Sequence, residues 1–317
     1  MAKKKELKTL ETLETLENNK EVRLIKTRQI IWNEIKADRR AFISLCIFTF
    51  IMISVFIGAW IIGTEAALNF DLFNMNHAPN WWQWGPAPRT GGILGTDTAG
   101  RDMLQILIVS TRNSIAIGFS VAIIAIIIGV AVGLISGFYG GHIDNVLMRI
   151  VDFLIVLPTI MIMVIIRSSV VGFGVGHMIL LLAGFGWLAR SRLIRSVTFG
   201  ERVKEYVLAS KTLGTPNIVI IIKKVFPNII TVVMADIIIT LGISVGIEVG
   251  LTAMGVGLPP GIPSLGNLVA NALVAINMQQ RAWNWLPAIL MVFILMLTIN
   301  YVGQAISRAA NAQQRRS

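Results

Sequence analysis

The sequence predicts an all-α, polytopic membrane protein that spans a bilayer about six times. Its 317 residues are 55% hydrophobic and only 14% charged, and the mean hydropathy is +0.72. A soluble domain of this length carries roughly 25% charged residues. The net charge is +11, but the basic residues flank long apolar runs. This pattern indicates membrane topology and not a nucleic-acid-binding surface.

A transmembrane helix needs about 20 mostly apolar residues, and six runs approach that length. The third run is interrupted by Asp152, Pro158 and Arg167, and the fourth is the shortest. The first begins only at Ala41, behind a charged segment, so a cleavable signal peptide is not expected. The six runs are Ala41–Gly63, Ile115–Phe138, Val146–Val171, Met178 to about Leu193, Asn228 to about Met254 and Trp285 to about Val302.

The placement of lysine and arginine predicts the orientation of these spans. Eleven basic residues precede Ala41 and eight lie between Arg190 and Pro227, whereas the long stretch between the first two runs holds only three. Six spans place these two basic regions and the basic tail on the same side of the bilayer. That side is expected to be the cytoplasm, with both termini in it.

The spans divide the chain into three parts. Residues 1–40 form a cytoplasmic segment, in which Glu21–Arg40 is expected to be a basic interfacial helix. Residues 41–306 form the transmembrane domain, with an external segment at 64–112 and a cytoplasmic loop at 196–227, and residues 307–317 form a cytoplasmic tail. Three tryptophans of the external segment are expected to be interfacial anchors: Trp81, Trp82 and Trp84.

Motifs for catalysis are missing from the sequence. No GxxxxGK[ST] loop occurs, so the chain is not expected to hydrolyse nucleotide by itself. His77, His142 and His177 are isolated and lack metal-site spacing, and the single cysteine, Cys46, lies in an apolar run. The sequence therefore predicts a protein that is not an enzyme and that binds no cofactor of its own.

The cytoplasmic loop carries the most informative pattern. Tyr206–Leu213 is expected to form a short helix that ends at Gly214, a residue suited to a left-handed C-terminal cap. Pro227 is expected to begin the next span, where its missing N–H costs nothing. A short charged helix between two spans is suited to docking in a groove of another protein, although an ordinary loop helix is the alternative.

This loop resembles the EAA signature of bacterial ABC importer permeases, E-A-A-x3-G-x9-I-x-L-P. Aligned on Gly214, the triplet is Leu208-Ala209-Ser210, and the spacing to Pro227 fits. Four positions depart from the signature: Leu208 for Glu, Ser210 for Ala, Lys224 for Ile and Phe226 for Leu. The ATPase-coupling residues that the resemblance implies are Glu205, Leu208, Ala209, Ser210, Lys211, Gly214 and Pro227.

Two further stretches are similar to the C-type permeases of dipeptide and oligopeptide importers. Leu94–Asp102 resembles their L-G-T-D-x-x-G-R-D, with turn and N-cap chemistry expected at Thr96 and Asp97. Glu248–Asn267 resembles their E-x-x-L-S-F-L-G-L-G … P-S-W-G-N, with Leu265 where tryptophan is usual. The external motif residues are Thr96, Asp97, Gly100, Arg101 and Asp102.

Two carboxylates inside the fifth run are candidates for a pathway or a gate, because burying charge in a membrane is costly. Along the helix from Pro227, Asp236 lies about 13 Å in and Glu248 about 30 Å in, near the outer end. A structural ion pair or hydrogen bond remains the alternative for both. Three other charged residues are expected to snorkel or pair near span ends: Arg149, Asp152 and Arg167.

The resemblance covers about Arg40 to Ile306 and implies the permease fold of binding-protein-dependent ABC importers. It implies a peptide-importer subunit in the bacterial cytoplasmic (inner) membrane, with a second homologous permease, two ABC ATPases that use ATP and magnesium, and an extracellular or periplasmic peptide-binding protein. No nucleic-acid partner is implied. Nickel or another small solute stays open as cargo. An ion-coupled secondary transporter using Asp236 and Glu248, or a membrane scaffold, is the alternative function.

Overall fold

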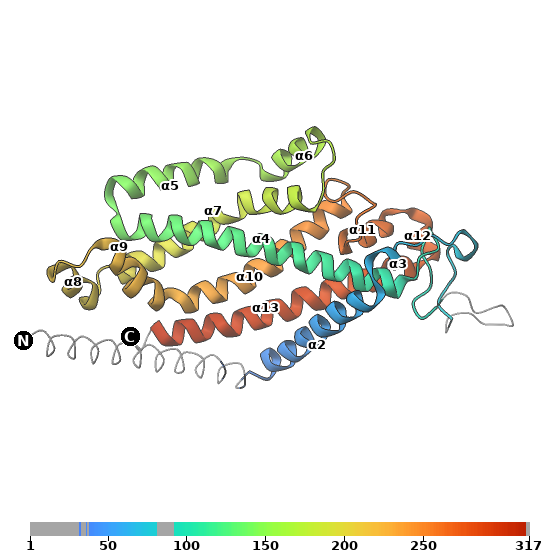
Figure 1. Ribbon diagram of the computed structural model, residues 1–317, viewed down its shortest axis with the longest axis horizontal. Helices are drawn as coiled ribbons and strands as arrows, with labels where there is room; N and C mark the ends of the chain where they lie inside the picture. Colours follow the sequence, from blue (N-terminus) through green and yellow to red (C-terminus); the bar gives the residue numbers. More distant parts are fainter. Residues whose placement is uncertain (1–31, 33–35, 37, 81–91, 315–317) are drawn as a thin grey trace, which may run out of the picture.

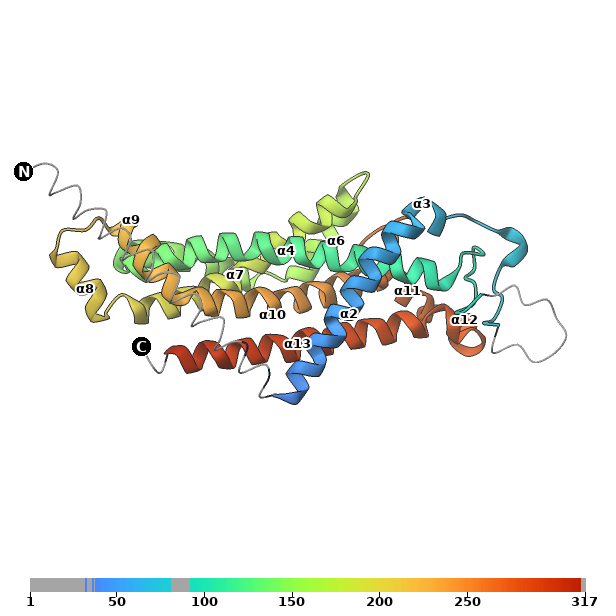
Figure 2. The same cartoon turned by 60° about the horizontal axis from the view of Figure 1, so that its bottom comes forward.

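The computed structural model describes residues 32, 36, 38–80 and 92–314. This part of the chain contains helices and no strands. Five of these helices are long and apolar enough to cross a membrane, and one bent pair makes six if it is counted as one span. Most of them run along one axis, and the first span crosses the others obliquely (Figures 1 and 2). The prediction of an all-α protein with about six transmembrane helices is confirmed. The five are α2 (Arg39–Ile62), α4 (Met103–Tyr139), α7 (Val175–Glu201), α10 (Phe226–Ala253) and α13 (Leu286–Gln314).

Two spanning helices extend beyond the apolar runs that predicted them. α4 begins at Met103, well before Ile115, because the Asp102 carboxylate caps it and accepts the N–H groups of Leu104 (2.8 Å) and Gln105 (3.1 Å). The fourth predicted run is also not short, since α7 continues through its arginines to Glu201. Hydropathy missed these turns because polar residues extend a helix as readily as apolar ones when they find partners.

The third predicted span is broken, as its interrupting residues indicated. α5 (Gly141–Val156) and α6 (Thr159–Ser169) are bent by 76° at the break between them. Pro158 lies at this break, and Leu157 before it has extended backbone angles (φ −63°, ψ 138°). A residue that precedes proline is disfavoured in the helical region, so the bend has a local cause.

The fifth span starts earlier than predicted. Pro227 stands in the first turn of α10, as expected, but the helical path already begins with α9 (Asn217–Ile220). A π turn, Ile221–Val225, joins α9 to α10. The wider π turn ends two residues before Pro227, whose ring would crowd the carbonyl of the preceding turn in a regular α-helix.

Helices α4 and α7 pack with their backbones almost in contact. A Cβ atom built on Gly133 would lie 2.7 Å from Ile194 Cβ and 2.8 Å from the Ser191 carbonyl oxygen. Gly129 and Gly137, one turn away on either side, leave equally little room. Small residues at every fourth position let two membrane helices approach closely.

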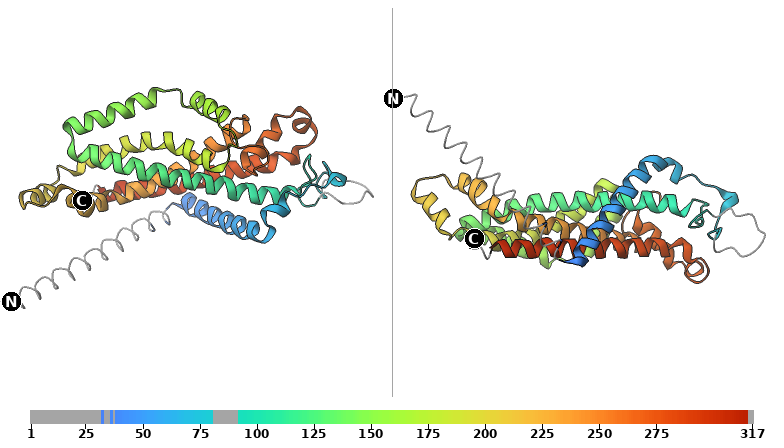
Figure 3. Two further views of the ribbon diagram at one scale, coloured as in Figure 1. Left: turned by 45° about the horizontal axis from the view of Figure 1, so that its top comes forward. Right: turned by 90° about the horizontal axis from the view of Figure 1, so that it is seen from below.

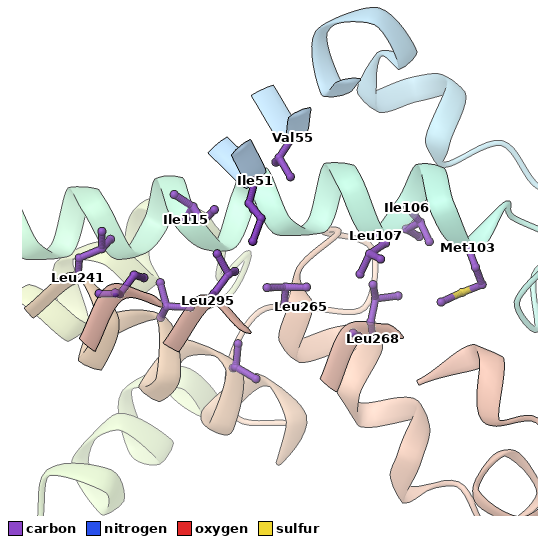
Figure 4. Packing of buried hydrophobic residues seen from close by; sticks show 14 of the residues in the cluster. Ile51, Val55, Met103, Ile106, Leu107, Ile115, Leu241, Leu265, Leu268 and Leu295 are labelled. Atoms are coloured by element: carbon purple, nitrogen blue, oxygen red, sulfur yellow. The ribbon is translucent and has the colours of Figure 1, made fainter. Parts of the chain in front are cut away.

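A second packed layer joins α4 to α2, α10 and α13. Figure 4 shows its buried side chains, which include Ile51, Leu107, Leu241, Leu265 and Leu295. Leu265 begins the short helix α11 (Leu265–Ala270), so the segment after α10 folds back into this core. The core thereby fixes the position of the second stretch that resembles peptide permeases.

The molecule has two distinct ends (Figures 1 and 2). One end carries α8 (Glu205–Thr212) and α9, and the opposite end carries α3 (Thr64–Ala67), α11 and α12 (Ala275–Gln280). We name them the α8 end and the α11 end. Arg308 of α13 forms an ion pair with Asp38, next to the start of α2, so the start of α2 lies beside the C-terminal part of α13 (Figure 3).

Two predictions fall outside the described residues. The interfacial helix expected over Glu21–Arg40 lies almost entirely there, and so do Trp81, Trp82 and Trp84.

The glycine contact predicts a position-specific loss of stability. Gly133→Leu should destabilise the protein by about 1–3 kcal/mol, because the added side chain meets backbone atoms of α7 that cannot move aside. Thermal unfolding in detergent measures the effect. Gly184→Leu on α7 is the matched control, since nothing lies within 4 Å of a Cβ built there. An equal loss in both variants would contradict the packing argument.

Candidate functional site

Helix α8 presents one face to the rest of the chain and leaves another uncovered. Val207 is buried in a cluster with Phe138 and Ile194. Leu208 and Leu213, in contrast, are 50% and 83% exposed. Large apolar side chains exposed on a short polar helix and at its C-cap are candidates for an interaction surface.

The end of α8 has the predicted geometry. Gly214 has φ +74°, and its N–H donates to the carbonyl oxygen of Lys211 (3.0 Å). The N–H of Thr215 donates to the carbonyl oxygen of Ser210 (3.1 Å), so the last carbonyls of the helix are satisfied. The predicted short helix and its glycine cap are confirmed.

A buried carboxylate that the sequence reasoning missed fastens α8 to α7. Glu201, the last residue of α7, accepts a hydrogen bond from the Tyr206 hydroxyl (2.6 Å) and forms an ion pair with Lys204 (2.8 Å). Its spacing of three residues from Lys204 is the only signal in the sequence. One turn after Val207, the Lys211 ammonium lies 4.7 Å from the centre of the Phe138 ring.

All but one of the predicted coupling residues lie in the same part of the structure. Six of them belong to α8 or its cap, and among these Ala209 and Lys211 are exposed while the Ser210 hydroxyl donates to the Tyr206 carbonyl oxygen (2.7 Å). Pro227 instead belongs to α10, beyond the π turn. The six residues of α8 and its cap are Glu205, Leu208, Ala209, Ser210, Lys211 and Gly214.

At the α11 end, the motif Thr96–Asp102 folds into a compact turn. The Asp97 carboxylate accepts the N–H groups of Ala99 (2.8 Å) and Arg101 (2.9 Å) and pairs with the Arg101 guanidinium (2.6 Å). The predicted turn chemistry is therefore present at Asp97. The predicted N-cap is wrong by five residues, because the residue that caps α4 is Asp102 and not Asp97.

This turn is held against neighbouring segments. Gly100 has φ +76°, and a Cβ atom there would lie 1.8 Å from the Asp71 carbonyl oxygen, so no other residue fits. The Thr96 hydroxyl donates to the Asn74 carbonyl oxygen (2.5 Å), and the Trp283 indole N–H donates to the Thr96 carbonyl oxygen (3.2 Å). The motif thus connects the segment before α4 to the loop before α13.

Glu248 is fully buried near the α11 end of α10. Its carboxylate accepts hydrogen bonds from the Ser114 hydroxyl of α4 (2.8 Å) and the Thr252 hydroxyl (3.1 Å). The Ser114 oxygen in turn accepts the N–H of Leu265 (3.0 Å). This network joins α4, α10 and the start of α11, as expected for a buried charge that must be fully hydrogen-bonded.

The segment 254–264 folds over this network. The Leu258 N–H donates to the Thr252 hydroxyl oxygen (3.2 Å), and a Cβ on Gly257 would lie 2.1 Å from the same oxygen. The Asn267 amide donates to the carbonyl oxygens of Pro259 (3.0 Å) and Ile262 (2.8 Å). The segment therefore closes the molecule above Glu248 through polar contacts that hold its backbone.

Asp236 has a different partner. It is buried and pairs with Arg190 of α7 at 3.1 Å, while its second carboxylate oxygen and the Arg190 Nε have no hydrogen-bond partner among the described residues. Asp236 and Glu248 are about 18 Å apart along α10 and share no partner. The structure thus does not bring the two predicted carboxylates together.

Two further arginines of α7 pair with α5. Arg195 makes two bonds of 2.5 Å to the Asp144 carboxylate, and Arg192 pairs with Asp152. Within the described residues, no group of three or more histidine, cysteine or acidic side chains is placed to hold a metal ion. The polar side chains of the site therefore connect helices to one another.

The comparisons with known proteins agree with this architecture. Residues 129–316, more than half of the chain, match the family described as "Binding-protein-dependent transport system inner membrane component". The oligopeptide transport system permease protein OppC of Lactococcus lactis subsp. cremoris is 34% identical over 284 residues, which cover 90% of this chain and 94% of that protein.

Two other relatives are more distant. OppC of Mycobacterium tuberculosis is 33% identical over 232 residues, or 72% of this chain and 78% of that protein. The dipeptide transport system permease protein DppC of Bacillus subtilis is 28% identical over 288 residues, or 91% and 86% of the two chains. The chain is a permease subunit and belongs to the family of inner membrane components of binding-protein-dependent transport systems.

Proposed function

We propose that this chain forms half of the transmembrane pathway of an ATP-driven peptide importer. A second homologous permease completes the pathway, two ABC ATPases bind at the α8 end, and a peptide-binding protein docks at the α11 end. ATP and magnesium belong to the ATPases. The observation that carries the proposal is the exposure of Leu208 on α8 and of Leu213 at its C-cap in a chain of this family.

The shape of α8 supports ATPase docking. Leu208 and Leu213 supply the apolar contact, while Val207 and Tyr206 hold the helix on the body of the subunit. Lys223 and Lys224 on the π turn that follows α9 are also exposed, and no ion pair joins them to a described residue. The complementary groove is therefore expected to be apolar with an acidic rim.

The environment of Glu248 supports a gate and argues against peptide recruitment. A fully buried carboxylate that already accepts two hydroxyl hydrogen bonds offers no free face to a peptide ammonium. The hydroxyl groups of Thr252 and Ser114, which donate to Glu248, in turn accept the N–H groups of Leu258 and Leu265 and so hold the segment 254–264 at both its middle and its end. We therefore assign to Glu248 the role of holding segment 254–264 in place at the α11 end. We call this segment, in its held position, the external closure.

Peptide is proposed as cargo because the names of the relatives specify oligopeptides or dipeptides. Nickel or another small solute is the competing cargo. Proteoliposomes that contain the complete transporter, loaded with ATP and supplied with binding protein, should accumulate labelled tetra-alanine. Uptake of labelled nickel with no uptake of the peptide would reject the proposed cargo.

The α8 end is proposed to be cytoplasmic, which labelling in intact cells can test. In a Cys46→Ser background, Phe73→Cys should react with an impermeant thiol reagent, because Phe73 is 94% exposed at the α11 end. Lys223→Cys should react only after the cells are permeabilised. The reverse pattern would invert the orientation.

Gly214→Asp should uncouple ATP hydrolysis from uptake. A non-glycine residue at φ +74° costs roughly 1–2 kcal/mol, and a negative charge opposes the C-terminal end of the helix dipole. Peptide uptake per ATP hydrolysed should fall about tenfold, which corresponds to 1.4 kcal/mol. Gly200→Asp, at an exposed position of α7 without positive φ, is the control. Wild-type coupling in Gly214→Asp would reject a role for this cap.

Glu248→Gln should loosen the external closure without changing cargo preference. The amide keeps the shape of the side chain but loses charge-assisted hydrogen bonds from Ser114 and Thr252. ATP hydrolysis without binding protein should rise about tenfold, given the usual worth of such bonds.

Acetylated and free tetra-alanine should be affected equally by this change. Glu65→Gln, an exposed carboxylate of α3 at the same end, is the matched control. A selective loss of transport for peptides with a free amino group would instead support recruitment by Glu248. Wild-type transport of every cargo and wild-type ATP hydrolysis in Glu248→Gln would reject both the gate role and the recruitment role of Glu248.

A further inference from the structure

Helices α5 and α6 form an arm that has little core of its own. α5 buries only Asp144 and Val151, and α6 buries only Met163, whereas each of the other spanning helices with described side chains has at least five buried residues. In Figure 1 the arm runs beside α7 from the α8 end to the α11 end. A helix with so few buried apolar contacts is held by its polar attachments.

At the α8 end, the arm is attached to α7. Arg195 donates two hydrogen bonds of 2.5 Å to Asp144, and Arg192, three residues earlier on α7, pairs with Asp152, eight residues further along α5. α7 continues into α8 through only three residues, and Glu201 fastens the two helices together. A displacement of α8 is therefore passed to α7 and, through these ion pairs, to α5.

At the α11 end, the arm is attached to the external closure. The Arg167 Nε–H of α6 donates to the Gly257 carbonyl oxygen (2.9 Å), and its guanidinium carbon lies 4.9 Å from the centre of the Phe173 ring. Gly257 is seated directly against Thr252, which donates to Glu248. Arg167 is thus two contacts away from the network that holds the closure.

A simple helix-capping role does not account for Arg167. A cation in the last turn of a helix interacts favourably with the helix dipole, and Arg167 occupies that turn. Its hydrogen bond, however, reaches Gly257, a residue 90 positions away in the sequence, in the segment 254–264. Met163 and Leu258, which belong to one buried cluster, are the apolar part of this junction.

We propose that Arg167 is a positioning residue through which the α5–α6 arm controls the external closure, so that movement of α8 at one end reaches segment 254–264 at the other. The proposal rests on the closure assigned above to Glu248. It adds a physical connection between the two ends that runs outside the packed core of α4, α10 and α13.

Thiol labelling of the complete transporter tests this connection. In a Cys46→Ser background, Leu258→Cys reports opening of the closure, because Leu258 is 3% exposed. Arg167→Gln should raise its labelling rate about tenfold, the change expected when a hydrogen bond from a charged group is lost. Arg167→Lys, which keeps the charge, should show a smaller increase. Arg149→Gln on the same arm is the control, since no ion pair joins Arg149 to a described residue.

The decisive measurement combines the two attachments. Asp144→Asn, at the far end of α5, should change the labelling rate of Leu258→Cys when Arg167 is present and should have no effect when Arg167 is Gln. Such non-additivity between distant sites is not expected from two separate losses of stability. No effect of Asp144→Asn in either background, or independent effects that multiply, would overturn the proposal.

A further variant separates this proposal from the function on which it rests. Glu248→Gln should also raise the labelling of Leu258→Cys, because it weakens the same closure. If Glu248→Gln has no effect, the closure itself is rejected. If Glu248→Gln acts and Arg167→Gln does not, the closure stands and only the role of Arg167 is lost.

Discussion

The close contact between α4 and α7 is the constraint on which the other helix positions depend. Because Gly129, Gly133 and Gly137 leave no side chains between the two helices, the backbone of α7 lies directly against α4. The long arginines of α7 then reach past α4 to carboxylates on its other neighbours. Arg190 meets α10, and Arg195 meets α5. The contact between α4 and α7 thus determines which charged residues of α5, α7 and α10 can form ion pairs.

This arrangement divides the subunit into parts that are held in different ways. The block of α2, α4, α10 and α13 is joined by buried apolar side chains, whose packing resists displacement. The α5–α6 arm is joined to α7 by ion pairs, of which Arg192–Asp152 is largely exposed and so contributes little stability. Exposed apolar side chains such as Phe153 and Val156 leave the arm to be covered by lipid or by the proposed second permease. Those features suit a part that moves against a rigid block.

The sequence was sufficient for the features that depend on local chemistry. Apolar length predicted the spans, Pro158 marked the bend, and Gly214 marked the end of α8. The sequence did not predict which side chains from different helices would pair. Neither the pairing of Asp236 with Arg190 nor the anchoring by Glu201 follows from spacing, because each depends on which helices become neighbours. The early start of α4 was missed for a similar reason, since hydropathy does not register a helix that leaves the apolar layer.

The two carboxylates of α10 show how position decides the role of the same chemical group. Asp236 faces a fixed arginine, so its charge is neutralised within the subunit and holds α7 to α10. Glu248 faces only hydroxyl groups, so its charge is stabilised by hydrogen bonds that a small displacement of α4 or α11 can break. An ion-coupled transporter needs a carboxylate that a passing cation can reach, and neither group is exposed. The energy for movement is therefore expected to come from outside the chain, through α8, with Glu248 at the point where that movement is released.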